Sequence, residues 1–206
     1  MSPAAEDERA RVLADIIAAR RSVRVFSEAM PARKDIERII AAGLAAPYAA
    51  AMSPDGRLDR RFFVISPASA ALGAAVKAIQ IHAQQALAAP ATPAALRDRL
   101  QPVAEGRIPG VGSAPYYIVL AEPQSIAASQ SLAHALENMW LTATALGLGM
   151  QLISLTATMS DDAAFCEILG LPVGKYALNG CVVGVPAQAP APRSAPVAAD
   201  VTHWLD

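Results

Sequence analysis

The segment SIAASQSLAHALENMWLTATALGLGMQLISL, residues 125–155, carries the longest apolar pattern of the chain. Its apolar residues recur at the three- and four-residue spacing of a buried helix as far as the glycines at 147 and 149, and glycines commonly end helices. The stretch that follows, MQLISL, has the composition of a buried strand. We therefore predict a central helix that turns at the glycines into a strand over 150–155.

This central segment also raises the question of a membrane span. No charged residue occurs between Met139 and Met159, and an apolar stretch of that length could cross a bilayer. Threonine, glutamine and serine residues interrupt it, however, and the predicted change from helix to strand divides it into two shorter elements. We predict that both elements are buried in the protein core and that the protein does not associate with membranes.

The other predicted elements lie on both sides of the central segment. We expect helices over 6–20 and 31–47, a strand over 61–66, two helices within the Ala-rich stretch 68–105, strands over 116–121 and 179–185, and a helix over 161–172. The helix over 161–172 should be capped by Asp161 or Ser160 and should end at Gly170. The chain length fits one domain over residues 1–206, with an extended Pro- and Ala-rich arm from about residue 186.

Composition limits the classes of function. Hydrophobic residues make up 54% of the 206 residues, charged residues make up 17%, and the net charge is −1. A chain without an excess of basic charge lacks the field that binds nucleic acid, so we expect no nucleic-acid partner. The apolar surplus indicates that some surface meets a partner chain. The N-terminus carries early acidic residues and lacks the pattern of an export signal, which favours a cytoplasmic protein.

The cysteines and histidines are scattered singly along the chain. Cys166 and Cys181 lie in apolar patterns and form no CxxC motif, so we expect both to be reduced and structural. The three histidines show no metal-ligand spacing, and we expect no metal site. His134 lies on the apolar central helix, where we predict a hydrogen-bonded core residue.

The main candidate for a binding site is a group of arginines. Arg20, Arg21 and Arg24 surround Ser22 at the point where a helical pattern gives way to an extended one. Guanidinium groups and a hydroxyl can supply several donors to one phosphate at close range. A solvated helix end, with cations beside its negative dipole, explains the same residues equally well. The residues alone leave both interpretations open.

Known nucleotide and nucleophile motifs do not decide between the two interpretations. The sequence contains neither a G-x-S-x-G elbow nor a Walker motif. The G-x-G at 147–149 follows a predicted helix and precedes a strand, which is the reverse of a dinucleotide-binding turn.

A resemblance to a known family favours the phosphate-binding interpretation of the arginine group. The chain resembles the nitroreductase family of FMN enzymes in a series of motifs that keep the family's order: RRSVRVF (20–26), RFFVI (61–65), APYYIVLAE (114–122), ALENMWLTATALGLGMQLIS (135–154), GVPAQAPAPR (184–193) and VTHWLD (201–206). The resemblance implies an α+β three-layer sandwich in which helices flank a mixed, mostly antiparallel sheet. It also implies an intertwined homodimer with two FMN sites at the interface.

The resemblance assigns expected roles to individual residues. Arg20, Arg21 and Ser22 match contacts to the FMN phosphate and ribityl chain, and Arg193 matches a distal phosphate contact. Arg24 matches a basic residue beside the flavin pyrimidine edge, where a cation stabilises the reduced, anionic flavin. The main chain of Leu152, Ile153, Ser154 and Leu155 matches the segment that approaches flavin N5.

One stretch departs from the family pattern. After the second predicted helix, the family usually carries Ser, Asn and Gln-Pro, which hydrogen-bond the flavin ring from the partner chain. Here Pro47 is kept, but Tyr48 and Ala49 follow it and open an apolar run. We expect Pro47, Tyr48 and Ala49 to contact the flavin through backbone groups and apolar surface, with Ser53 as a substitute donor.

These observations predict an FMN-dependent oxidoreductase. NADH or NADPH would reduce the flavin, and a small-molecule acceptor, such as a nitro-aromatic, a quinone or an enone, would reoxidise it. The flavin performs the chemistry, so we predict no catalytic side chain. Two alternatives belong to other classes: a flavin-binding sensor or carrier without turnover, and a dimeric interaction module without a cofactor.

Overall fold

The computed structural model describes residues 3–48, 59–108, 110–191 and 202–205 of the chain. Four strands form one sheet in the order β1-β2-β4-β3: β1 (Arg61–Ile65), β2 (Tyr116–Pro123), β4 (Tyr176–Gly184) and β3 (Gly149–Leu152). Each pair of neighbouring strands is antiparallel. The parallel component expected of a mixed sheet is a single bridge between Ser22 and Met150 at the edge of β3.

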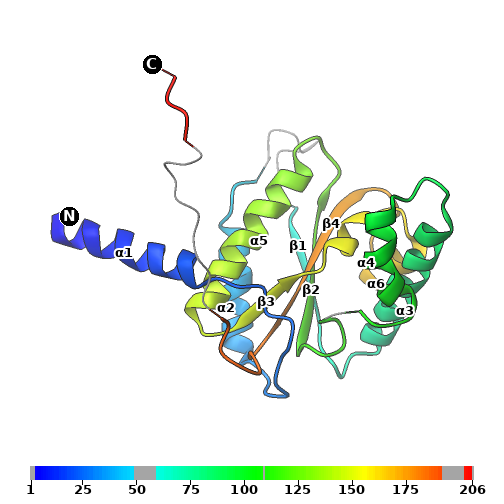
Figure 1. The fold of residues 1–206 in the computed structure, drawn as a ribbon, viewed down its shortest axis with the longest axis horizontal. Helices are drawn as coiled ribbons and strands as arrows, with labels where there is room; N and C mark the ends of the chain where they lie inside the picture. Colours follow the sequence, from blue (N-terminus) through cyan, green and yellow to red (C-terminus); the bar gives the residue numbers. More distant parts are fainter. Residues whose placement is uncertain (1–2, 49–58, 109, 192–201, 206) are drawn as a thin grey trace.

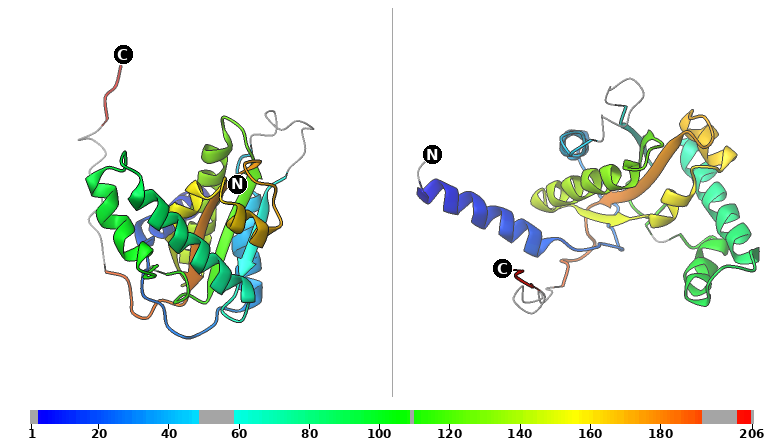
Figure 2. Two further views of the ribbon diagram at one scale, coloured as in Figure 1. Left: turned by 90° about the vertical axis from the view of Figure 1, so that its right-hand side faces the viewer. Right: turned by 90° about the horizontal axis from the view of Figure 1, so that it is seen from above.

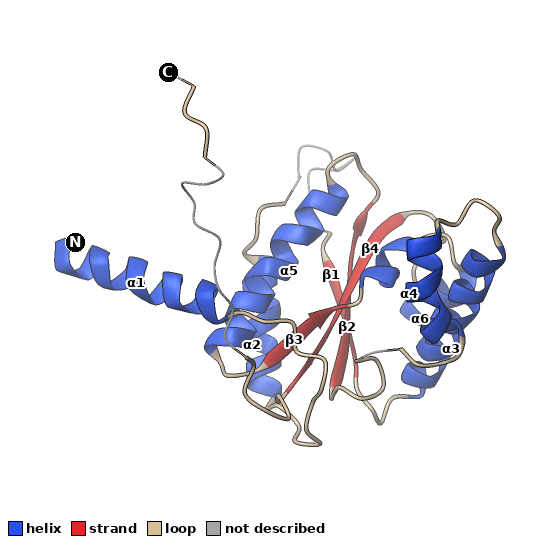
Figure 3. Ribbon diagram, viewed as in Figure 1, coloured by secondary structure: helices blue, strands red, loops and turns tan. Residues whose placement is uncertain are grey.

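Helices cover both faces of the sheet and make three layers (Figures 1, 2 and 3). One face carries α2 (Arg33–Leu44) and α5 (Ala128–Ala145), and the other carries α3 (Ala70–Ala88), α4 (Ala94–Ala104) and α6 (Ala163–Leu169). Because side chains alternate across a strand, β2 contributes to two cores: Ile118 and Leu120 face the layer of α2 and α5, while Tyr117 and Val119 face the layer of α3 and α6. The predicted α+β three-layer fold is confirmed.

The central helix of the sequence is α5, and one face of it is buried in the core. Leu132, Ala135, Met139 and Ala143 recur at helical spacing and are fully buried. The helix ends at Ala145, and Gly147 adopts a φ of 73°, which favours glycine in the turn into β3. The uncharged segment 139–159 is thus divided between α5, β3 and a short 3-10 helix, η2 (Ser154–Thr158). Within the described residues, every helix is too short or too polar to span a bilayer.

Three local predictions are corrected by the structure. The strand expected over 150–155 ends at Leu152, because after a last hydrogen bond from the Ile153 N–H to Gly180 O (2.8 Å) the chain turns into η2 and Thr156 packs against Gly180. The cap of α6 is Asp162, whose carboxylate accepts from the Phe165 N–H (2.9 Å), rather than Asp161 or Ser160. His134 is exposed rather than part of the core, because it lies on the outer face of α5.

The first helix, α1 (Pro3–Ala19), extends away from the rest of the chain (Figure 1). It contacts α5, and yet its apolar side chains Val12, Leu13 and Ile17 are about half exposed. Exposed apolar residues at helical spacing form a stripe that this chain leaves uncovered.

The two thiols are expected to be unreactive in the folded protein. Cys166 and Cys181 are free and buried, and burial raises the pKa of both thiols above the usual value, which lowers their thiolate fraction at neutral pH. We expect the native protein to resist a disulfide reagent such as DTNB and both thiols to react after denaturation. If the flavin chemistry implied by the resemblance holds, a double Cys→Ala variant should keep flavin reduction. A variant that binds FMN but cannot be reduced would instead identify a redox thiol.

Candidate functional site

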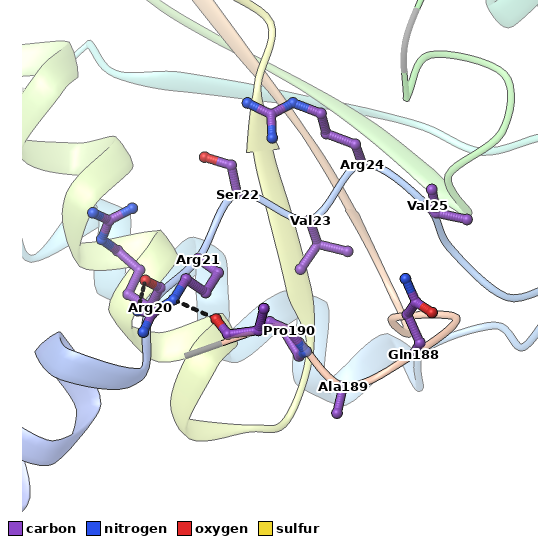
Figure 4. A pocket seen from close by; sticks show the side chains of 10 residues that line it. Arg20, Arg21, Ser22, Val23, Arg24, Val25, Gln188, Ala189 and Pro190 are labelled. Carbon is purple, nitrogen blue, oxygen red and sulfur yellow. Dashed lines mark hydrogen bonds between the residues drawn. The ribbon is translucent and has the colours of Figure 1, made fainter. Parts of the chain in front are cut away.

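The arginine segment lines a cavity. Residues 20–25 form one wall and residues 188–191 form the other, around a volume of about 640 Å³ (Figure 4). Pockets that hold cofactors typically have volumes of about 300–1,000 Å³. The predicted group of Arg20, Arg21, Ser22 and Arg24 is therefore gathered on one cavity large enough for a nucleotide-sized ligand.

The segment is held against β3 by its backbone and by Val23. The Val23 N–H donates to Met150 O (3.1 Å), and the buried Val23 side chain packs on Gly149. A side chain at Gly149 would meet Val23, since an added Cβ would lie 2.7 Å from Val23 Cβ. Glycine at the start of β3 thus allows the arginine segment to approach the sheet closely.

This extended conformation sorts the arginines onto two sides. Figure 4 shows Arg20, Ser22 and Arg24 pointing to one side, while Arg21 points away from it. Successive side chains of an extended segment alternate in direction, which explains the division. Ser22 and Arg24 are exposed, and the structure pairs neither side chain with a described residue.

Arg21 is engaged by the main chain. Its Nη1 donates to Ala18 O (2.6 Å) and Arg20 O (2.7 Å), and its Nε donates to Ala191 O (3.0 Å). Arg21 therefore ties the end of α1 to the C-terminal arm. The arm is further held where the Ser27 N–H donates to Val185 O (2.9 Å) and the Ala187 N–H donates to Val25 O (3.1 Å).

The predicted N5 segment forms the turn from β3 into η2. Leu152 and Ser154 are exposed, whereas Ile153 is buried and Leu155 packs partly into the core. Thr156 fixes the turn to strand β2 through a hydrogen bond with the Tyr117 hydroxyl (2.7 Å). Gly180 makes room for Thr156, because an added Cβ would lie 2.6 Å from Thr156 Oγ1. The turn is thus fixed by the core while its alternate residues face outward.

Pro47 and Tyr48 lie elsewhere on the chain. They line a smaller pocket of about 190 Å³ with Ser131 and His134, near the N-terminal end of α5. Trp140, which contacts the arginine segment, lies nine residues further along α5, or about 13 Å at 1.5 Å per residue. One chain therefore does not bring Pro47 and Tyr48 to the arginines. Ala49, Ser53 and Arg193 lie outside the described residues.

A buried ion pair holds the Pro47 segment, and the sequence patterns did not predict it. The side chains of Arg60 and Glu122 are 0% and 2% exposed, and Arg60 Nε donates to Glu122 Oε1 (2.5 Å). The other nitrogens of Arg60 donate to Gly43 O, Ala46 O, Pro47 O and Ser131 Oγ. Three of these carbonyls lie at or just after the C-terminal end of α2, where a helix leaves acceptors without helical partners, and Gly43 O also accepts from the Ala46 N–H (3.3 Å). The sequence signal that could have indicated this ion pair was the carboxylate of Glu122 at the end of the apolar run YYIVLAE.

Fold and site together define a class of protein. An antiparallel sheet lies between two helical layers, and beside the edge strand β3 an arginine-lined cavity presents donors suited to an anionic ligand. Residues 17–185 match the model of the nitroreductase family, and the chain belongs to that family.

Solved structures share the fold. A nitroreductase with bound FMN from Bacteroides fragilis is 23% identical, with a TM-score of 0.71 over 94% of this chain and 98% of that one. A nitroreductase with bound FMN from Desulfitobacterium hafniense is also 23% identical, with a TM-score of 0.68 over 94% and 98%. An FMN- and NADPH-dependent nitroreductase mutant from Sphigopyxis sp. strain HMH is 20% identical, with a TM-score of 0.65 over 93% and 98%. No curated protein matches the chain.

Proposed function

We propose that the protein is an FMN-dependent oxidoreductase that passes electrons from NADH or NADPH through the flavin to a small acceptor. The observation that carries this proposal is one extended segment whose Arg20, Ser22 and Arg24 side chains point to the same side, beside a cavity of about 640 Å³, in a chain of the nitroreductase family. Structures that share the fold include nitroreductases with bound FMN. The family supports an oxidoreductase, and the cavity fits its cofactor in size and charge.

The residues of the cavity would hold the cofactor in distinct ways. Arg20 and Ser22 would bind the phosphate and ribityl chain through charge-assisted and neutral hydrogen bonds. Arg24 would place a cation beside the pyrimidine edge, where it favours the reduced anion. The exposed side of the turn at Leu152 and Ser154 would offer main-chain groups to the ring. FMN, when bound, supplies the hydride chemistry, and we assign no acid or base among the described side chains.

A homodimer completes this proposal. The uncovered stripe of Val12, Leu13 and Ile17 on α1 is the kind of surface that a second copy of the chain covers. Pro47 and Tyr48, which are remote from the arginines of their own chain, would then reach the flavin bound by the partner. The proposed site is thus shared between two chains, and the C-terminal arm would pack at the same interface.

The proposal is tested by the cofactor and its reduction. Freshly purified protein should be yellow and should release FMN on denaturation. Stopped-flow mixing with NADH or NADPH should bleach the visible flavin absorbance, and nitro-aromatic, quinone or enone acceptors should restore it. A colourless protein that cannot be loaded with FMN would contradict the assignment.

A second candidate, a flavin-binding sensor or carrier, is favoured by one feature. Apolar residues replace the family's polar flavin-ring contacts after Pro47. Such a protein would bind FMN tightly but would be reduced by neither nicotinamide at a catalytic rate. The same stopped-flow experiment separates the two functions.

A further inference from the structure

Helix α5 presents two side chains to Arg20. Glu137 and Trp140 lie three residues apart and therefore share one face of the helix. Arg20 Cζ lies 4.7 Å from the centroid of the Trp140 ring, and Arg20 Nε lies 3.4 Å from Glu137 Oε1. With these contacts the Arg20 side chain is only 22% exposed, in contrast to the exposed Arg24.

Trp140 also holds the residue after Arg20. Its indole Nε1–H donates to Arg21 O at 3.1 Å. One side chain thus fixes the guanidinium of Arg20 and the backbone of Arg21 at the same time. The neighbours of Trp140 in the helix, Met139 and Ala143, are fully buried, so the indole is presented by a rigid part of the core.

These contacts leave the two terminal nitrogens of the Arg20 guanidinium available to a ligand. Glu137 faces Nε and the indole covers a face of the guanidinium, while the two terminal nitrogens make no hydrogen bond to any described residue. A guanidinium held in one orientation binds an anion with less loss of side-chain entropy than a free one. The geometry is that of a support for a phosphate-binding arginine.

We propose that Trp140 is a positioning residue that sets the preference of the site for FMN over riboflavin, by directing the terminal nitrogens of Arg20 toward the flavin phosphate. This inference rests on the proposed function, since it requires Arg20 to bind the phosphate. Trp140 itself touches the arginine segment and acts on the ligand through Arg20.

The test compares two flavins, and it compares variants of Trp140 with a control variant at an exposed residue outside the site. Apoprotein is titrated with FMN and with riboflavin, and binding is followed by the quenching of flavin fluorescence. In the Trp140→Leu variant, loss of the cation–π contact should weaken FMN binding about three- to thirtyfold. The riboflavin affinity of this variant should stay within about twofold of the wild-type value. Trp140→Phe keeps an aromatic face and should lose less. Val173→Ala, at an exposed residue between α6 and β4 that lies outside the proposed site and the arm, should change neither affinity.

A double-mutant cycle separates the possible failures. In an Arg20→Ala background, Trp140→Leu should weaken FMN binding much less than it does in wild type, because Arg20 is gone and only the hydrogen bond of Trp140 to Arg21 O is left to lose. Losses that add would overturn the role of Trp140 while leaving the proposed function intact. An Arg20→Ala variant that binds FMN like wild type would overturn the phosphate contact together with this inference. Equal losses for FMN and riboflavin would identify Trp140 as structural only.

Discussion

The Arg60→Ala variant is expected to lose about 3–5 kcal/mol of the free energy of unfolding, because it leaves the carboxylate of Glu122 buried without its cation. Arg60 also donates to Gly43 O and Pro47 O, which would lose a partner at the end of α2. Urea unfolding of the holoprotein, at fixed protein and FMN concentrations, measures the loss.

The adjacent residue provides a matched control. Arg61 forms its ion pair with Asp59 at a partly exposed site, where side chains are 44% and 34% exposed, and it lies over the Tyr176 ring. Exposed pairs contribute little, so Arg61→Ala should cost at most about 1 kcal/mol. Equal losses for the two variants would show that the burial of Arg60 has no energetic consequence.

Arg60 also affects the proposed site, because its guanidinium donates a hydrogen bond to Pro47 O. Its guanidinium also lies 5.6 Å from the ring centroid of Tyr48, and the Tyr48 hydroxyl accepts from the Asp59 N–H (3.4 Å). The segment that we propose to meet the partner's flavin is therefore fixed from inside the chain. A second, stabilising substitution could restore the free energy of unfolding of the Arg60→Ala variant. The activity of that double variant would then show how far activity depends on the hydrogen bond between Arg60 and Pro47 O.

The second large effect is expected at Arg20. If Arg20 binds the FMN phosphate as proposed, its replacement by alanine removes a charge-assisted pair worth about 1.5–3 kcal/mol, which corresponds to roughly a ten- to hundredfold loss of FMN affinity. Riboflavin lacks the phosphate and should bind wild type and Arg20→Ala about equally weakly. Titration of the apoprotein with both flavins measures the difference.

Arg24 provides a contrast on the same face. If it lies at the pyrimidine edge, Arg24→Ala should retain FMN and lower the flavin midpoint potential, because the cation acts mainly on the reduced anion. Arg21→Ala should weaken binding indirectly, since the Arg21 guanidinium holds Ala18 O and Ala191 O in this structure. Should all three variants bind FMN like wild type, the cluster is a solvated helix end.

The sequence predicted the elements because their signals are local. Helical spacing in α2 and α5, β-branched and aromatic runs in β1, β2 and β4, and glycines at turns each depend on a few neighbouring residues. The α+β fold class followed from those elements and from the order of motifs. Three arginines within five positions also marked one wall of the cavity, because residues so close in the chain stay close in space.

The tertiary structure decided what those residues touch. Arg20 meets Glu137 and Trp140, and Arg60 meets Glu122, across sequence separations of 62 residues or more. It also ended the strand at Leu152, because Gly180 on β4 gives Thr156 its place. Contacts of this kind depend on how layers pack rather than on local spacing, so no periodicity records them. Local patterns determined the elements, and only packing could pair their side chains.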